Sequence, residues 1–157
     1  MFSGCGSLYK SFRGHGYVSQ WYDKLQRGAV NDLSALGGLI VAIRDTLCIR
    51  AGGLLHGGHP CYGFVFMSSG AHWRHLCIMG HPGQPMVDTS NLLVARFSLI
   101  LLLCIAIKVH FTVEQPSSSK LVYIPYIQHL LEALRNGVHF KRFWMGLYGH
   151  ACPKPSW

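Results

Sequence analysis

A cysteine that follows a proline, in a loop rich in glycine and histidine, is the feature of this sequence that most suggests chemistry. The run from His59 to Phe64 reads His-Pro-Cys-Tyr-Gly-Phe, directly after an apolar segment, 54–56, that predicts a short strand. A nucleophilic cysteine needs solvent access and a lowered pKa, and a rigid turn at the end of a strand is a setting that can provide both. The alternative interpretation of Cys61 is a small buried thiol.

A glutamate stands at the end of a second predicted strand, 109–113. Glu114 is one of only two glutamates in the chain, and a proline and three serines follow it closely. A carboxylate in this place could hold a proton against a ring nitrogen of a substrate. An acid that caps the following turn is the other interpretation.

Two glycines near the start of the chain, Gly4 and Gly6, precede a helical segment and could let the backbone pass close to a nucleotide-like ligand. A plain structural turn would look the same. Asp23 ends a predicted strand, 17–22, where an acid can accept hydrogen bonds from ribose hydroxyls or can simply be solvated. Asp32 could cap the helix that follows it.

Length and composition favour one folded domain over residues 1–157. Half of the residues are hydrophobic, and 14 Lys and Arg against 6 Asp and Glu give a formal charge of +8. The basic residues are scattered, which favours a basic folded surface that binds a polyanion such as nucleic acid, although an acidic membrane surface would also suit the charge.

The six cysteines have irregular spacing and no secretory signal precedes them, so we expect free thiols in a reducing compartment, nuclear or cytoplasmic. The most apolar stretch, 97–107, is shorter than the ~20 residues that a membrane-spanning helix needs. We therefore expect a buried helix and no membrane partner.

Helical periodicity predicts helices over 33–49, from 89 or 90 to 107, and over 124–134, while strands are predicted at 17–22, 54–56, 109–113 and 138–145. This alternation predicts an α/β fold with βαβ units, a mainly parallel sheet and helices on both faces. Ligands in such folds bind beyond the carboxyl ends of the strands. The glycine-rich start, Asp23, the Cys61 loop and Glu114 would all lie at that edge.

Taken in order, these segments resemble the cytosine-5 DNA methyltransferase family. The start is similar to the family's Phe-x-Gly-x-Gly turn, and residues 57–64 are similar to its Gly-x-Pro-Pro-Cys-Gln-Gly-Phe loop. Residues 69–70 with Arg74 match the continuation of that loop, and residues 113–116 stand where the family has Glu-Asn-Val. Residues 148–154 are loosely similar to Phe-Gly-x-Pro-Gln-x-Arg.

The resemblance implies a Rossmann-like methyltransferase sheet and S-adenosylmethionine as cofactor. The target would be a cytosine in DNA, or alternatively in RNA, that has been rotated out of the helix. The thiolate of Cys61 would attack C6 of this base, while Glu114 holds a proton at N3. Arg74 and Lys154 would contact nucleic acid. The implied cofactor contacts are Phe2, Gly4, Gly6, Asp23, Asp32 and Pro60.

The chain also departs from the family pattern. Tyr62 replaces the glutamine after the cysteine, Gln115 replaces the asparagine, and Lys154 falls in the motif that carries arginine. We expect the first strand to be largely missing and the target-recognition region to be absent. The sequence thus favours an enzyme of this type that could be inactive as this piece, and it leaves the oligomeric state open.

Two other functions fit the sequence. One is a nucleic-acid-binding module of the same fold without catalysis, which the charge and the altered motifs favour. The other is a zinc-stabilised interaction domain, because a His-x-x-His-x-Cys pattern ends at Cys61 and again at Cys77, with His81 nearby.

Overall fold

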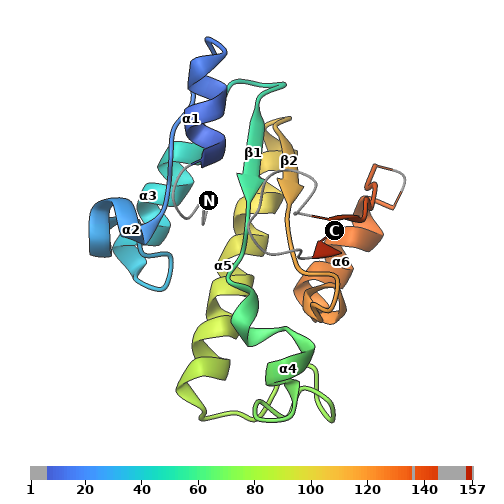
Figure 1. Ribbon diagram of the computed structural model, residues 1–157. Coiled ribbons are helices and arrows are strands. Elements are labelled where there is room, and N and C mark those ends of the chain that lie inside the picture. Colours follow the sequence, from blue (N-terminus) through green and yellow to red (C-terminus); the bar gives the residue numbers. More distant parts are fainter. Residues whose placement is uncertain (1–6, 136, 145–154, 157) are drawn as a thin grey trace. The chain divides into compact units, whose positions relative to one another are not determined.

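The computed structural model describes residues 7–135, 137–144 and 155–156 of the chain (Figure 1). They form two compact units. The first unit holds the described residues up to 59 together with 99–113, and the second holds 60–98 and the described residues from 114 onward. The chain therefore passes from the first unit to the second and back again before it ends in the second.

A two-stranded parallel sheet belongs to the first unit. β1 (Leu54–Gly57) pairs with β2 (His110–Val113), and both arrows point the same way in Figure 1. A bond between His56 Nδ1 and Thr112 Oγ1, 2.9 Å long, links the two strands on one face. The long helix α5 (Pro85–Ala106) lies between them in sequence, as a parallel pair requires. The predicted α/β class and these two strands are confirmed.

Besides the C-terminal part of α5, the described part of the first unit has four helical segments, all of which precede the sheet in sequence. They are α1 (Ser7–Gly14), α2 (Lys24–Arg27), the 3₁₀ turn η1 (Gly28–Asn31) and α3 (Leu36–Leu47), the last of which confirms the helix predicted over 33–49. The strand predicted at 17–22 is wrong, because this segment pairs with no other backbone segment among the described residues. Its aromatic pattern instead buries Tyr22, whose hydroxyl donates to the Gly38 carbonyl at 2.7 Å.

Helix α5 begins at Pro85, earlier than the predicted cap, and is 22 residues long. Proline suits the first turn of a helix, because its missing N–H would be unpaired there, and Asp88 complements the helix dipole. The helix is long and apolar enough to cross a membrane, but a core helix passes the same test. Val94, Phe97, Ile100 and Cys104 are fully buried at helical spacing, as in a core helix.

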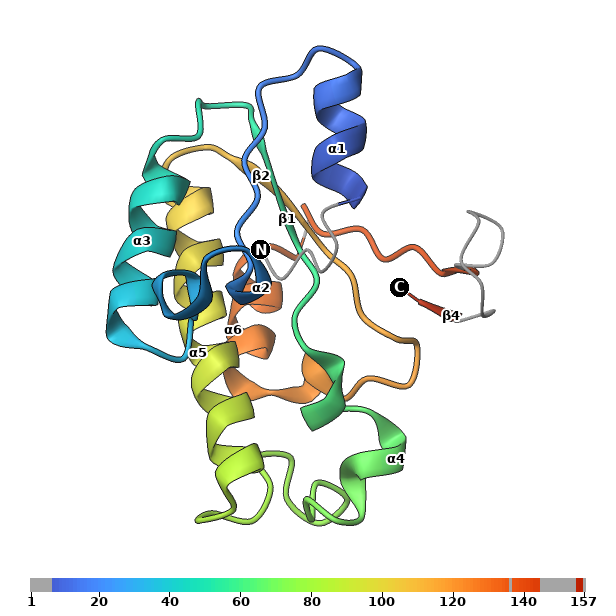
Figure 2. The same ribbon diagram turned by 60° about the vertical axis from the view of Figure 1, so that its left-hand side comes forward.

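The second unit contains η2 (Cys61–Gly63), α4 (Phe66–Ser69), η3 (Leu121–Tyr123) and α6 (Pro125–Ala133). α6 confirms the helix predicted over 124–134. Of the strand predicted at 138–145, only β3 (Phe143–Trp144) is described as strand, and it pairs antiparallel with β4 (Pro155–Ser156) (Figure 2). The core of this unit includes the fully buried side chains of Phe64, Val87 and Ile124.

Candidate functional site

The loop that carries Cys61 is a single tight turn. Pro60 precedes the turn with an extended ψ of 115°, and the carbonyl oxygen of Cys61 accepts hydrogen bonds from the amides of Phe64 and Val65 at 2.9 and 3.1 Å. Cys61 is a free cysteine and is half-buried. The turn therefore fixes the backbone of Cys61, and Cys61 remains partly accessible to solvent.

Gly63 closes this turn against α5. A side-chain carbon at Gly63 would collide with the Cβ and hydroxyl oxygen of Ser90, and that hydroxyl donates to the Met86 carbonyl at 2.6 Å. The glycine is required here by close approach rather than by an unusual φ. The contact sets how closely the Cys61 turn packs on the helix.

Backbone contacts join the Cys61 segment to the segment that begins with Glu114. Val65 forms an antiparallel bridge with Ser119, and the amide of Lys120 donates to the Phe64 carbonyl at 2.8 Å. Both segments belong to the second unit. The structure therefore brings together the two loops that the sequence singled out for chemistry.

Glu114 is half-buried at the start of the second loop, and its neighbour Gln115 is fully buried. The Gln115 side-chain oxygen accepts a hydrogen bond from the Ser119 hydroxyl at 3.0 Å, and that hydroxyl in turn accepts from the Leu121 amide at 3.2 Å. Gln115, where the family has asparagine, thus braces the loop that begins at Glu114.

Arg74 lies inside the second unit, with 2% of its surface exposed. Its guanidinium carbon lies 4.3 Å from the centre of the Phe64 ring, and its Nη atoms donate to the Ile78 carbonyl at 2.6 Å and to Asn91 Oδ1 at 2.9 Å. Burial lowers the pKa of Arg74, and the nearby Cys77 offsets part of this effect. In this structure Arg74 ties the 74–80 loop to α5, and contact with nucleic acid stays a prediction.

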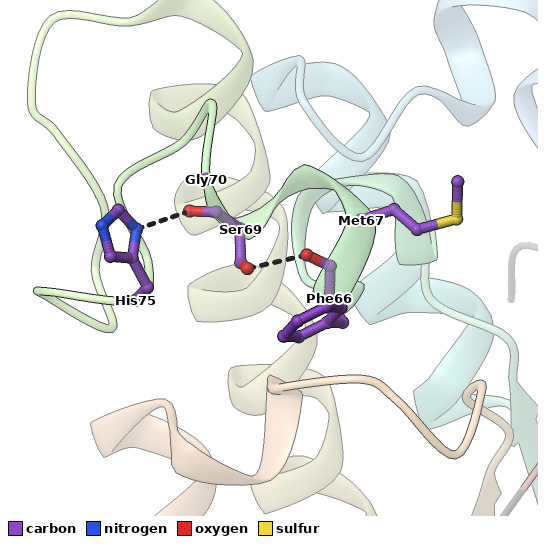
Figure 3. A pocket seen from close by; sticks show the side chains of 5 residues that line it. All are labelled: Phe66, Met67, Ser69, Gly70 and His75. Carbon is purple, nitrogen blue, oxygen red and sulfur yellow. Dashed lines mark hydrogen bonds between the residues drawn. The ribbon is translucent and has the colours of Figure 1, made fainter.

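An open hollow of about 440 Å³ is lined by residues that follow the Cys61 turn in the chain, and no sequence pattern indicated it (Figure 3). Its walls are mostly apolar, and the side chains of Phe66 and Met67 are largely exposed. The His75 ring bonds to the Ser69 carbonyl at 3.3 Å, and the Ser69 hydroxyl donates to the Phe66 carbonyl at 2.7 Å. Gly70 completes the lining.

The described part of the predicted cofactor set lies mainly in the first unit. Asp23 is buried and Asp32 is half-buried, with Oδ1 of Asp32 accepting from the amide and hydroxyl of Ser34 at 2.9 and 2.7 Å. Asn31 donates to the Asp23 carbonyl at 3.3 Å. Asn31 Oδ1 and Trp21 Nε1 are buried and find no hydrogen-bond partner among the described residues.

These two unpartnered atoms, one acceptor and one donor, fit a polar ligand beside Asp23. The residues present are therefore compatible with a nucleoside-like group. Phe2, Gly4, Gly6 and Lys154 lie outside the described residues.

The four described cysteines are all free and differ in access. Cys104 is buried in α5, and burial raises the pKa of its thiol to about 11, which makes it a poor nucleophile. Cys48 and Cys77 are exposed. In the described part of the chain no three His, Cys, Asp or Glu side chains are grouped to hold a metal ion, so the geometry does not support the zinc alternative there.

Ser90, Asn91 and Ser119 are the site residues that sequence reasoning missed. Ser90 and Asn91 lie in the polar run at 88–91, and Ser119 ends a run of three serines; these polar runs were the only signal in the sequence. Comparison with family profiles, curated proteins and solved structures finds no match to this chain.

Proposed function

We propose that this chain carries the chemistry of cytosine-5 methyl transfer on a Rossmann-like sheet, with Cys61 as nucleophile and Glu114 as the acid that holds a proton. The observation that carries the proposal is the parallel ladder in which Gly57 lies opposite Val113, because the Cys61 and Glu114 loops leave the sheet directly after these residues. The Val65–Ser119 bridge supports it further by joining the two loops.

In the proposed reaction the Cys61 thiolate forms a bond to C6 of cytosine, and the C5–C6 double-bond electrons move into the ring. Glu114 holds a proton at N3, which stabilises the negative charge that develops there. C5 would then take the methyl group, and the donor would leave as S-adenosylhomocysteine. A solvent hydroxide ion would remove the C5 proton as water, and the electrons of the C5–H bond would form the C5–C6 double bond as the Cys61–C6 bond breaks to restore the thiolate. The ring regains its double bond.

S-adenosylmethionine supplies the methyl group when it is bound. Asp23 and Asp32 would hold its ribose and adenine, and Pro60, Phe2, Gly4 and Gly6 complete the proposed contacts. The unpartnered Trp21 Nε1 and Asn31 Oδ1 add a donor and an acceptor to the Asp23 side of this set.

DNA is the proposed partner, with RNA as an alternative, because the chain carries a formal charge of +8. Lys141 and Arg142 are adjacent exposed basic residues of the second unit that suit phosphate contacts. Lys154 is a further proposed contact. The free thiols support a reducing intracellular compartment, nuclear or cytoplasmic.

A methyl-transfer assay tests this function. The full chain is incubated with S-adenosylmethionine that carries a labelled methyl group and with duplex and single-stranded DNA, and 5-methylcytosine is quantified. We expect product with the native chain and with Cys77→Ser, a matched control at an exposed cysteine, and none with Cys61→Ser. Glu114→Gln should lower the rate by at least about 10²-fold, the usual contribution of a general acid.

An absence of product from the native chain would contradict the catalytic proposal. If DNA binding then persists in Cys61→Ser and weakens steeply with salt, the chain is the non-catalytic nucleic-acid-binding module that the sequence also allows.

A further inference from the structure

Helix α3 turns its large apolar residues outward. Leu36, Ile40 and Leu47 are 65%, 59% and 55% exposed, and Ile43 on the same face is half-buried. The opposite face consists of the small residues Gly38, Ala42 and Thr46, all buried. Surface helices normally show the reverse arrangement, so within the described residues of the first unit this face of α3 packs on no apolar partner.

Specific contacts hold α3 in this orientation. A side-chain carbon at Gly38 would collide with the backbone of Asp32, and the Gly38 carbonyl accepts the buried Tyr22 hydroxyl at 2.7 Å. The close packing of the inner face therefore depends on its small residues. Rotation of the helix to bury Leu36 and Leu47 would break these contacts and bring larger side chains against the Asp32 backbone.

The outward residues are spaced four, three and four apart, which is the spacing of a helix–helix seam. This spacing reads the same in both directions. If two copies of α3 lie antiparallel, Leu36 of one faces Leu47 of the other, and Ile40 faces Ile43. Such pairing is self-complementary, as a two-fold interface requires.

Charge also favours a second copy over a polyanion. Arg44 and Asp45 are the only charged residues of α3, and they pair with each other at 2.7 Å, so the helix has no net charge although the chain is strongly basic. The exposed parts of Leu36, Ile40 and Leu47 form an apolar stripe of roughly 300 Å², a size at which apolar patches are often functional.

We infer that two copies of this chain associate through antiparallel pairing of their α3 helices. A standard interface takes about 800 Å² from each partner, and the stripe with its flanking residues provides less, so the dimer is weak and reversible. The inference does not depend on the proposed catalytic function.

The test is the molar mass of the full chain by sedimentation equilibrium over about 1 µM to 1 mM. We expect the mass to rise with concentration toward twice the chain mass of 17.5 kDa. The double substitutions Leu36→Glu/Leu47→Glu and Leu36→Lys/Leu47→Lys place like charges opposite each other, so each variant should stay monomeric. Mixed in equal amounts, the two variants should form a heterodimer.

Orientation is tested by Leu36→Glu/Leu47→Lys, which places opposite charges in contact only if the helices are antiparallel. This variant should dimerise more strongly than the two like-charge variants. Val18→Glu, at a fully exposed apolar residue outside α3, is the control and should leave the dimer unchanged. Far-UV circular dichroism checks that each variant folds.

A native chain that stays monomeric at all concentrations would overturn the inference, and so would a dimer that the Leu36→Glu/Leu47→Glu variant leaves intact. A chain that stays monomeric and floats with lipid vesicles would also overturn the inference, because the apolar stripe would then bind lipid instead of a second copy. If Leu36→Glu/Leu47→Lys is as monomeric as the like-charge variants, the antiparallel pairing is wrong.

Discussion

Gly57 lies directly opposite Val113 in the parallel ladder, and each residue ends its strand. Both strands therefore release the chain at the same edge of the sheet. After β1 the chain reaches the Cys61 turn within three residues, and after β2 it continues at once into Glu114. This geometry makes the two loops candidates for one site, because ligands of parallel sheets bind beyond the carboxyl ends of the strands.

Gly63→Ala should destabilise the second unit, because the new methyl group has to displace Ser90 or the backbone. Overpacking of this kind costs about 1–3 kcal/mol in the free energy of unfolding. Urea denaturation measures it. Gly70→Ala is the matched control, since a side-chain carbon there meets no atom within 4 Å. Equal stability of the two variants would contradict the close packing of the Cys61 turn on α5.

Arg74→Lys should lower the free energy of unfolding by about 1–3 kcal/mol, because lysine cannot replace both Nη hydrogen bonds inside the protein. The predicted contact of Arg74 with nucleic acid is tested with Arg74→Gln, which removes the positive charge. The slope of log K against log salt falls by about 1 if Arg74 contacts a phosphate, and an unchanged slope limits Arg74 to its buried role in the second unit. Changing Lys141 and Arg142 together to glutamine should reduce the slope by about 2 and leave stability unaffected.

Phe66→Ala should weaken the binding of single-stranded DNA, because the exposed ring beside the Cys61 turn offers a surface on which a base can stack. Loss of one stacking contact costs about 1–3 kcal/mol, which fluorescence anisotropy detects as a weaker dissociation constant. Tyr123→Ala removes another largely exposed aromatic side chain from the same unit and serves as control. If both substitutions have the same effect, the hollow has no special role in binding.

Stability should fall at alkaline pH because two buried groups resist ionisation. Burial raises the pKa of Tyr22 to about 12 and that of Cys104 to about 11, so their contributions are complete below their ordinary values of 10 and 9. The contributions are lost as pH rises through about 9–11 for Cys104 and 10–12 for Tyr22.

Tyr22→Phe should cost about 1 kcal/mol at neutral pH through the lost bond to Gly38 and should flatten the fall above pH 10. Thermal melts between pH 7 and pH 12 measure both effects. An unchanged fall above pH 10 would show that Tyr22 ionises normally in the folded protein.

Local patterns were enough to predict the long periodic helices α3, α5 and α6 and the two short apolar strands β1 and β2. The strand predicted at 17–22 was wrong because strand formation depends on a partner, which residue types alone do not reveal. The face of α3 was not predictable either, since the stripe from Leu36 to Leu47 looks like a core face. The inner packing of Gly38 on Asp32 reverses that expectation.

For the candidate site, residue types and order were enough to single out Cys61 and Glu114, because each follows a short apolar strand. The role of Arg74 could not be read in the same way. Its burial depends on Phe64 and Asn91, which are ten and 17 residues away and become neighbours only in the folded unit. The hollow at Phe66 and His75 likewise arises from the path of the loop.

Covalent trapping tests whether Cys61 is the nucleophile that forms a bond to C6 of cytosine. DNA that contains 5-azacytosine is incubated with the native chain, with Cys61→Ser and with Cys77→Ser, and adducts are identified by denaturing electrophoresis and peptide mass spectrometry. We predict an adduct at Cys61 in the native chain and in Cys77→Ser, and none in Cys61→Ser. An adduct that persists in Cys61→Ser, or the absence of any adduct in the native chain, would contradict it.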